Sequence, residues 1–367
     1  MSDIDPEDDR RLKYGWTTGA CATAAAKAAY MALVNGRFPD TIKIALPKGQ
    51  TPEFELERTA LSGGIATAAV IKDAGDDPDV THGALIECRV QRARAGAGIS
   101  FLAGKGVGMV TRAGLPLAVG EPAINPAPRK MIIDNLASIH NPKEGPLDLE
   151  ITISVEDGEK LAKKTWNERL GIIGGLSILG TTGIVVPYSC SAWIHSIHRG
   201  IDVAREAGLD HVIGSTGSTS EKAAMKLYDL PLIAFLDMGD FVGGLMKYLR
   251  SQPLSRLTIA GGFGKLSKLA AGHLDLHSKR SQVDPSFLAA LAKQAGADDG
   301  LVSEIAAGGS AGAILQIAQN KSLALGDAVA KAAQTEAAKV SEGTFAVEVI
   351  LYDRLGHQVG RAGFEET

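Results

Sequence analysis

Cysteine is scarce in this sequence: there are 3 cysteines among 367 residues, Cys21, Cys88 and Cys190. They stand far apart and form no CxxC pair, so neither a zinc knuckle nor a disulfide framework is indicated. We therefore expect buried free thiols, as is usual for proteins of a reducing compartment.

Long apolar runs are missing as well. No stretch reaches the roughly 18 apolar residues that a membrane-spanning helix needs, so no membrane partner is expected. The first segment, Met1–Arg11, is acidic and polar and lacks the apolar core of a signal peptide. We expect residues 1–11 to be a disordered lead-in, and these absences together favour a cytoplasmic protein.

Positive charge is not in excess. The chain has 38 Lys and Arg against 42 Asp and Glu, a formal net charge of -4. No global basic field is therefore available to recruit nucleic acid or an anionic membrane, and no nucleic-acid partner is expected. An acidic small molecule would have to be bound by local basic clusters.

Two common nucleotide-binding motifs are also absent. GxGxxG does not occur, and no acidic residue ends the expected strand His211–Ile213, so a simple NAD fingerprint fails. Gly264-Lys265 is followed by Leu266, so the P-loop pattern GxxxxGK[ST] is not met. The pair His195 and His198 lacks an evident third metal ligand, and no protein-bound metal is expected.

Residues 12–158 have the pattern of an α+β domain. An Ala-rich run from Ala20 to Val34 predicts a helix that Asn35-Gly36 ends. Leu147–Val155 alternates apolar and polar residues, as expected of a half-solvated and mostly antiparallel sheet. Thr17 and Thr18 precede the helix, where they either cap it or leave its N-terminus open to an anion.

A glycine-rich segment lies within this domain. Gly104, Gly106 and Gly108 would expose backbone N–H groups, and Lys105 and Arg112 place positive charge beside them. A short glycine repeat is weak evidence for a phosphate loop. A generic surface loop and a loop that binds an acidic ligand both remain open here.

Residues 159–344 repeat an apolar strand, a glycine loop and a helix. The expected strands are Leu170–Ile173, His211–Ile213, Leu232–Leu236 and Leu257–Ala260. This repeat predicts an α/β domain with a doubly wound, mainly parallel sheet, whose ligand crevice lies at the carboxyl ends of the strands. The strand Phe345–Tyr352 and the rest of 345–367 cannot be assigned to a sheet. The residues expected to line the crevice are Gly174, Gly175, Gly180, Thr181, Thr182, Gly183, Gly214, Gly217, Asp237 and Asp240.

Another polar cluster follows the last of these loops. His273, Asp275 and His277 stand at alternate positions, with Lys265 and Lys268 close by in the sequence. A metal site would need further ligands, and a helix with a polar face is the plain alternative. We favour a site for a polycarboxylate in which a histidine transfers a proton.

Several blocks together resemble the CbiD family, the cobalt-precorrin-5B C1-methyltransferases of cobalamin biosynthesis. The resemblance runs from about residue 12 to the C-terminus. The blocks are Gly15–Lys27, Ala103–Gly108, Val119–Pro126, Leu170–Val185 and Gly264–Ser278.

The resemblance implies methyl transfer from S-adenosylmethionine to C1 of a corrinoid, giving cobalt-precorrin-6A, and a Rossmann-like second domain. The crevice residues would then bind S-adenosylmethionine, and His273, His277 and Asp275 would be the catalytic candidates. Two alternatives stay open, a nicotinamide-dependent reductase of the same pathway and a non-catalytic corrinoid carrier; self-association is left open too. The candidates for binding the tetrapyrrole carboxylates are Thr17, Thr18, Lys105, Arg112, Lys265 and Lys268.

Overall fold

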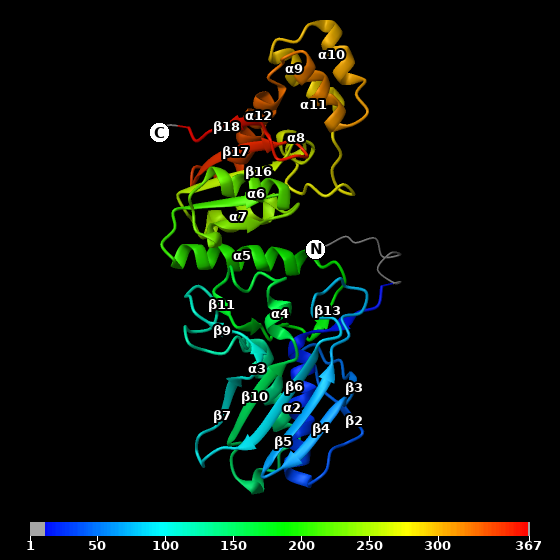
Figure 1. Ribbon diagram of the computed structural model, residues 1–367, viewed down its shortest axis with the longest axis vertical. Helices are drawn as coiled ribbons and strands as arrows, with labels where there is room; N and C mark the ends of the chain where they lie inside the picture. The colour runs from blue at the N-terminus through cyan, green and yellow to red at the C-terminus, as the bar shows by residue number, and fades with distance from the viewer. Residues whose placement is uncertain (1–11, 366–367) are drawn as a thin grey trace. The chain divides into compact units, whose positions relative to one another are not determined.

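The computed structural model describes residues 12–365, so the expected disordered lead-in 1–11 lies outside the described residues. The chain divides into two compact units, Met1–Ser189 (unit 1) and Cys190–Thr367 (unit 2) (Figure 1). The division differs from the boundary expected after residue 158, because residues 159–189 pair with strands of unit 1.

Unit 1 is built on a five-stranded sheet of order β4-β5-β6-β10-β7. All neighbours are antiparallel except β10 and β7. In β10 every second residue is buried, as its alternating sequence predicts. The strands are β4 (Arg58–Ser62), β5 (Ile65–Ile71), β6 (Leu85–Arg92), β7 (Ile99–Ala103) and β10 (Leu149–Val155).

The long helix α2 (Thr18–Asn35) packs against β5 and β6, with α3 (Pro126–Ala137) on it. All of its alanines are fully buried, because their small side chains let the helix lie close to the sheet. Thr17 caps its start and Gly36, at φ 74°, ends it in the left-handed conformation. Both ends agree with the sequence prediction.

Residues 158–189 complete unit 1 through short strand pairs. The strand β11 (Ile172–Ile173) pairs with β9 (Met109–Val110), and β12 (Gly175–Leu176) pairs with β8 (Gly106–Val107). The strand β13 (Ile184–Val185) pairs with β1 (Gly15–Trp16). The expected strand Leu170–Ile173 is therefore not part of the second sheet, and Ile173 is 48% exposed rather than covered on both faces. Unit 1 also contains the ribbon β2 (Thr41–Lys43) and β3 (Glu53–Glu55), the 3₁₀ turn η1 (Pro142–Glu144) and α4 (Gly158–Ala162).

Unit 2 contains a second five-stranded sheet, of order β15-β14-β16-β17-β18. The first four strands are parallel, and β18 is antiparallel to β17. The C-terminal strand that sequence alone could not assign is β17, which lies next to β16 in the middle of this sheet. The strands are β14 (His211–Ser215), β15 (Phe235–Asp237), β16 (Arg256–Gly262), β17 (Ala346–Tyr352) and β18 (Gln358–Ala362).

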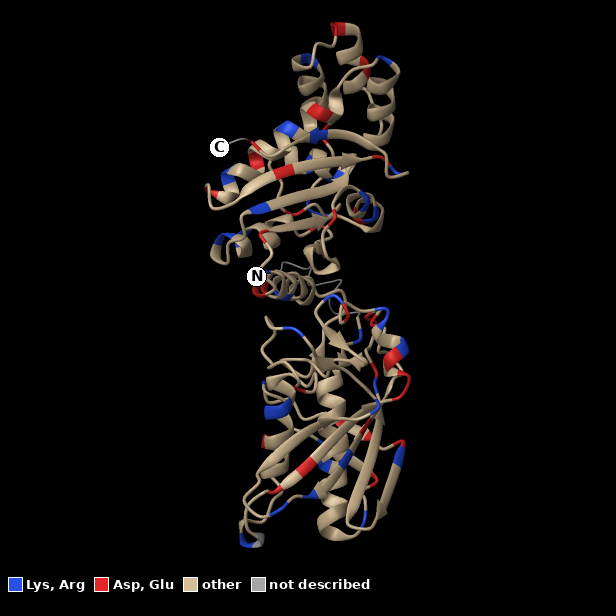
Figure 2. Ribbon diagram, turned by 60° about the vertical axis from the view of Figure 1, so that its left-hand side comes forward, with Lys and Arg blue, Asp and Glu red and all other residues tan. Residues whose placement is uncertain are grey.

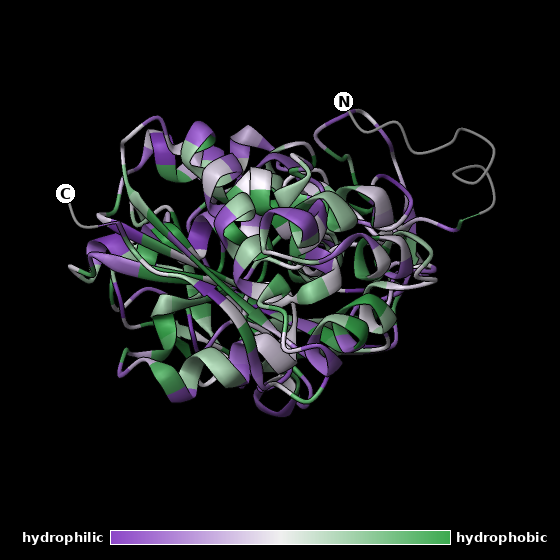
Figure 3. Cartoon of the chain, turned by 90° about the horizontal axis from the view of Figure 1, so that it is seen from above, coloured by the Kyte–Doolittle hydropathy of each residue, from purple (hydrophilic) through white to green (hydrophobic). Residues whose placement is uncertain are grey.

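Helices cover both faces of this sheet. Ala224 of α6 packs with Ile213 and Ala260 on one face. A side chain at Gly214 would meet Leu245 of α7, so α7 lies on the other face. Figure 3 shows helices with mixed green and purple residues on either side of the strands. The helices are α5 (Cys190–Glu206), α6 (Ser218–Leu227), α7 (Val242–Ser251), α8 (Phe263–Ala270), α9 (Pro285–Gln294), α10 (Asp299–Ala306), α11 (Ala311–Asn320) and α12 (Leu325–Ser341), with the 3₁₀ turn η2 (Leu232–Ala234).

A buried carboxylate lies at the centre of a network that links four strands of unit 2. Glu348 of β17 is fully buried and accepts two bonds from Arg361 of β18, at 2.9 and 2.7 Å. It also accepts from the hydroxyls of Tyr228 and of Thr258, the latter at 2.7 Å. The Thr258 hydroxyl in turn lies 2.8 Å from His211 Nε2. This network links β14, β16, β17 and β18, and displacing β18 would remove Arg361 and leave the buried carboxylate without its counter-ion.

Cys21 and Cys88 are buried free thiols as expected, whereas Cys190 is exposed. Burial raises the pKa of Cys21 to about 12, so this thiol stays protonated near neutral pH. Figure 2 shows acidic and basic residues interspersed along both units. Within residues 12–365, no helix combines the length and the apolarity that crossing a bilayer requires.

Candidate functional site at the carboxyl edge of the parallel sheet

Four parallel strands of unit 2 end side by side, at Ser215, Asp237, Gly262 and Tyr352. We call this end of the sheet the carboxyl edge. The chain leaves β14 toward β15 on one side, and β16 lies on the other side of β14. Adjacent strands whose connections depart in opposite directions leave a crevice between their loops, where ligands of open α/β sheets bind.

Lys265 joins the loops of this edge. It lies in the first turn of α8, and its Nζ donates to the carbonyl oxygen of Thr216 at 2.8 Å. The same Nζ is 3.0 Å from Asp240 Oδ1, in the loop after β15. One ammonium group therefore holds the loops that follow β14, β15 and β16. Lys265 and Asp240, which the sequence singled out separately, are brought together.

The helices that begin at this edge have no side-chain cap. The residues before α6, α7 and α8 are Gly217, Phe241 and Gly262, and none bonds a helix N–H through its side chain. By contrast, Asp284, Asp298 and Ser310 cap α9, α10 and α11. The edge therefore presents backbone N–H donors that a bound polar group can satisfy. A side chain at Gly214 would collide with Leu245 and Met238, so glycine allows close packing there, and its contact with a ligand stays a prediction.

The segment His273–His277, which we call the histidine segment, packs against the start of α7. Leu276 N donates to Asp240 O at 2.9 Å, and Gly243 N donates to Leu274 O at 2.9 Å. Lys268 is buried, and its Nζ donates to Leu276 O at 2.8 Å, so this candidate for substrate binding holds the segment in place. The expected basic cluster is thus divided, with Lys265 at the crevice and Lys268 beneath the segment.

The two histidines of this segment differ in their bonding. His273 and His277 are both exposed. His277 Nδ1 accepts from Lys279 N at 3.3 Å, so its proton in the neutral ring is assigned to Nε2. Asp275 accepts from His277 N at 3.0 Å and lies 3.6 Å from Arg280. His277 therefore offers a donor, and His273 is the better candidate for a base.

The glycines of the segment Leu170–Val185 belong to unit 1, whereas the carboxyl edge belongs to unit 2. A side chain at Gly175 would collide with the backbone of Gly106, at 2.3 Å, and one at Gly180 would collide with Thr17. A side chain at Gly183 would meet Leu46 at 2.5 Å. These three glycines allow chain segments to pack closely, whereas Gly174, at φ 87°, faces open space.

Thr17 and Thr18 both bond within unit 1. Thr17 Oγ1 accepts from Ala20 N at 3.1 Å, and Thr18 Oγ1 accepts from Leu179 N at 3.0 Å. Gly19 N donates to Leu179 O at 3.0 Å, so the chain itself occupies the start of α2. The capping interpretation is confirmed for Thr17. Thr182 bonds locally to Ile184.

The basic candidates of unit 1 lie on its surface. Lys105 and Arg112 are both exposed. The stem of Arg112 covers Gly171, where a side chain would lie 2.6 Å from it. The carbonyl oxygen of Lys105 accepts from Val155 N at 2.9 Å, which fixes the loop and leaves the ammonium group at the surface.

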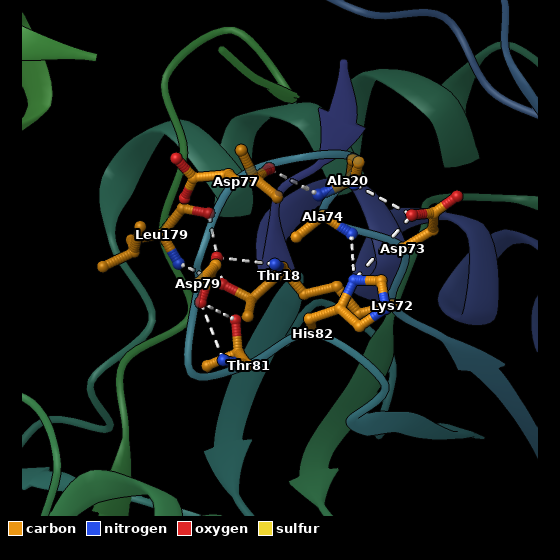
Figure 4. A network of polar contacts seen from close by, with 12 residues as sticks. Thr18, Ala20, Lys72, Asp73, Ala74, Asp77, Asp79, Thr81, His82 and Leu179 are labelled. Atoms are coloured by element: carbon orange, nitrogen blue, oxygen red, sulfur yellow. Dashed lines mark hydrogen bonds and ion pairs between the residues drawn. The ribbon is translucent and has the colours of Figure 1, made fainter. Parts of the chain in front are cut away.

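The structure adds a buried lysine that the sequence did not single out. Lys72 is 1% exposed, and its Nζ lies 2.7 Å from Asp79 Oδ2 (Figure 4). Asp79 Oδ1 also accepts from the backbone and hydroxyl of Thr81. Burial acts to raise the pKa of Asp79, but Lys72 and Thr81 outweigh it and hold that pKa below the usual 3.8. A lone Lys at the end of a strand pattern gives no signal of burial.

Comparison with known proteins decides the family. The family model described as CbiD matches residues 5–187, and the model for the CbiD C-terminal domain matches residues 275–363. A relative from Brucella anthropi, named cobalt-precorrin-5B C(1)-methyltransferase, is 56% identical over 97% of this chain and 97% of its own length. The chain belongs to the CbiD family.

Other members of the CbiD family are similar over most of the chain. A relative of the same name from Paramagnetospirillum magneticum is 55% identical over 97% of this chain and 99% of its own length. The crystal structure of the cobalamin biosynthesis protein cbiD from Archaeoglobus fulgidus is 29% identical, covers 76% of this chain and 91% of that one, and has a TM-score of 0.40. The two CbiD family models do not match residues 188–274, a range that includes Asp240 and Lys265.

Proposed function

We propose that this CbiD-family protein is a cobalt-precorrin-5B C1-methyltransferase, which uses S-adenosylmethionine to form cobalt-precorrin-6A in cobalamin biosynthesis. The relatives that carry this enzyme name match nearly the whole length of the chain at 56% and 55% identity. The substrate is accordingly a tetrapyrrole, and the protein is an S-adenosylmethionine-dependent C-methyltransferase.

We place S-adenosylmethionine at the carboxyl edge and interpret unit 2 as a Rossmann-like, doubly wound domain. The observation that carries this is the position of Lys265, which ties Thr216 to Asp240 beside the crevice between β14 and β16. Asp237 and Asp240 supply carboxylates suited to the hydroxyls and the ammonium group of the donor. Gly217 and Gly262 leave space, since a Cβ at either would have no neighbour within 4 Å.

The other expected cofactor-binding residues lie in unit 1. Gly175, Gly180 and Gly183 have packing roles there, so their contact with the donor stays a prediction, as does that of Gly174, Thr181 and Thr182. We assign the substrate carboxylates to exposed basic groups, with Lys105 and Arg112 as the candidates in unit 1. A cytoplasmic location and self-association also stay predictions.

The chemistry requires alignment and the removal of a proton. S-adenosylmethionine supplies a methyl group on a sulfonium, which a ring carbon attacks in line. Holding two reactants in that geometry contributes up to roughly 7–11 kcal/mol in favourable cases. Lys265 holds two loops in place, and these loops form the binding surface for one reactant. We assign the base to His273, because the Nδ1 of His277 already accepts a hydrogen bond.

The test is transfer of label from methyl-labelled S-adenosylmethionine to cobalt-precorrin-5B by the purified protein. We expect a product with one added methyl group, binding of S-adenosylhomocysteine and no binding of NADP⁺. Nicotinamide binding with reduction of the substrate would favour the reductase alternative. Tight tetrapyrrole binding without methyl transfer would favour the carrier alternative.

A further inference from the structure

The buried polar atoms that lack a hydrogen-bond partner gather at one place. Within residues 12–365 they are Ser215 Oγ, Asp240 Oδ1 and Tyr352 Oη. All three lie at or just beyond the carboxyl edge. Asp240 still has its ion pair with Lys265, but the two hydroxyls have no such compensation. Folded proteins rarely leave such groups unsatisfied, so a pair at one edge calls for a specific explanation.

The two hydroxyls belong to one face of the sheet. Ser215 is paired in register with Ala260 of β16, and Tyr352 is paired with Gly262, two residues further along the same strand. Side chains two residues apart point to the same side of a strand. Tyr352 packs with Ile213 and Ala224, so this face is the one that α6 covers. Ser215 is 0% exposed and Tyr352 is 3% exposed.

Beside Tyr352 the central strand has no side chain on this face. Gly262 lies on the central strand, directly beside Tyr352, and a Cβ built on Gly262 would meet no atom within 4 Å. Its φ of -67° is one that any residue adopts, so backbone strain does not explain the glycine. Two unpartnered hydroxyls therefore flank a space that a side chain could fill and does not.

The chemistry of this space suits an uncharged polar group. Burial raises the pKa of Tyr352 to about 12, so its hydroxyl is protonated near neutral pH and can both donate and accept. The Ser215 hydroxyl has the same capacity. Asp237 is aligned with Ser215 on the neighbouring strand, and its carboxylate disfavours an anion there. A sugar has hydroxyl groups that can bond to Ser215 and Tyr352 and that tolerate the neighbouring carboxylate of Asp237.

We infer that Ser215 and Tyr352 bind the nucleoside part of the methyl donor, which occupies the space over Gly262. This rests on the proposed function, because it takes S-adenosylmethionine as the ligand of the carboxyl edge. Both hydroxyls are covered, so the chain from Gly217 onward shifts when the ligand enters, while Lys265 keeps its bond to the carbonyl oxygen of Thr216. Gly217 permits that movement, since nothing lies within 4 Å of its Cβ position.

The first test uses Tyr352→Phe and Ser215→Ala, with calorimetric titration of S-adenosylhomocysteine and 5′-methylthioadenosine. We expect the Kd of both ligands to rise about 5- to 10-fold, which is the effect of losing one hydrogen bond. The melting temperature should not fall, because each change removes a buried hydroxyl that has no partner. The matched control is Tyr228→Phe, which should lower the melting temperature and leave binding unchanged, because Tyr228 bonds to Glu348.

The second test fills the space. Gly262→Ala should weaken both ligands more than tenfold while the melting temperature stays within about 2 °C of the wild type, as expected of an uncrowded site. Gly312→Ala is the control, since it also meets no atom within 4 Å, and it should bind normally.

The outcomes separate this inference from the proposed function. A wild-type protein that does not bind S-adenosylhomocysteine overturns the proposed function. A wild type that binds it, with Tyr352→Phe, Ser215→Ala and Gly262→Ala binding equally well, overturns only the inference. Weakened binding of S-adenosylhomocysteine alone, or no binding of 5′-methylthioadenosine by the wild type, overturns the nucleoside assignment.

Discussion

Lys265 Nζ lies 3.0 Å from Asp240 Oδ1, and this contact joins two loops at the carboxyl edge of unit 2. The side chain of Lys265 is 40% exposed and that of Asp240 is 21% exposed, so solvent screens the pair only in part. The contact leaves Asp240 Oδ1 with a counter-ion but without a hydrogen bond. A ligand at the carboxyl edge could therefore donate a hydrogen bond to Asp240 Oδ1.

Lys265→Met should remove this ion pair and the bond to Thr216. We expect a loss of about 1–2 kcal/mol in the free energy of unfolding, after allowance for exposure, and at least roughly tenfold weaker binding of S-adenosylhomocysteine. Urea denaturation and calorimetry would measure the two effects. Lys247→Met, at an exposed position of α7, is the control. Unchanged affinity in Lys265→Met would contradict the site.

His273→Ala should reduce turnover more than His277→Ala does. A well-placed general base contributes on the order of 10²–10⁴ in rate, and only His273 has both ring nitrogens unengaged by the hydrogen bonds of the segment. Single-turnover methyl transfer would measure the loss, and binding of S-adenosylhomocysteine should be unchanged in both variants. Near-normal turnover in His273→Ala would remove the assignment of the base.

Asp79→Asn should destabilise unit 1 by about 3–5 kcal/mol near neutral pH, because Lys72 would be left buried without its counter-ion. The pKa of Asp79 is lower in the folded chain than its ordinary 3.8, so the folded state binds this proton less readily than the unfolded state. Its stabilising contribution is thus present above about pH 4 and is lost as the pH falls below it.

The measurement is the free energy of unfolding of the wild type and Asp79→Asn over a pH series. The difference between them should shrink as the pH falls below about 4. Asp40→Asn, at an exposed position, controls for the change in net charge. A difference that is constant with pH would show that the pair with Lys72 does not carry the effect.

Thr17→Ala should cost about 1 kcal/mol of stability, the usual effect of losing an N-cap, and Thr17→Ser should retain most of it. We expect no change in the binding of S-adenosylhomocysteine. Thermal unfolding of the two variants provides the measurement. A raised KM for the tetrapyrrole in Thr17→Ser, with stability intact, would instead support the predicted role of Thr17 in substrate binding.

Local patterns predicted much of this fold. The alternation in Leu149–Val155 and the caps of α2 depend on neighbouring residues, so the sequence expresses them directly. The strand–loop–helix repeat from His211 onward also predicted β14 and β16. The third expected strand, Leu232–Leu236, is only partly confirmed, because Leu232–Ala234 form a 3₁₀ turn and β15 covers Phe235–Asp237. The hairpin of β4 and β5 was missed because β5 is rich in alanine, which favours helices.

Long-range pairing explains what was not predicted. The apolar run Leu170–Ile173 has the composition of a buried strand, but its partner in the sheet, Met109–Val110, lies far away in the sequence. Composition cannot reveal that partner, and the boundary between the units was misplaced for the same reason. Ser215 and Tyr352 were missed because the absence of a hydrogen-bond partner is a property of the folded chain.

The position of β17 also bears on how the chain folds during synthesis. Every strand of unit 1 precedes Ser189, so that unit can form while the ribosome is still extending the chain. The sheet of unit 2 can be completed only later, because β17 pairs with β16 and is synthesised after α8 to α12. Until then β16 is an open strand edge, able to pair with other chains. Expression conditions that slow the release of residues 346–362 should therefore favour aggregation of unit 2.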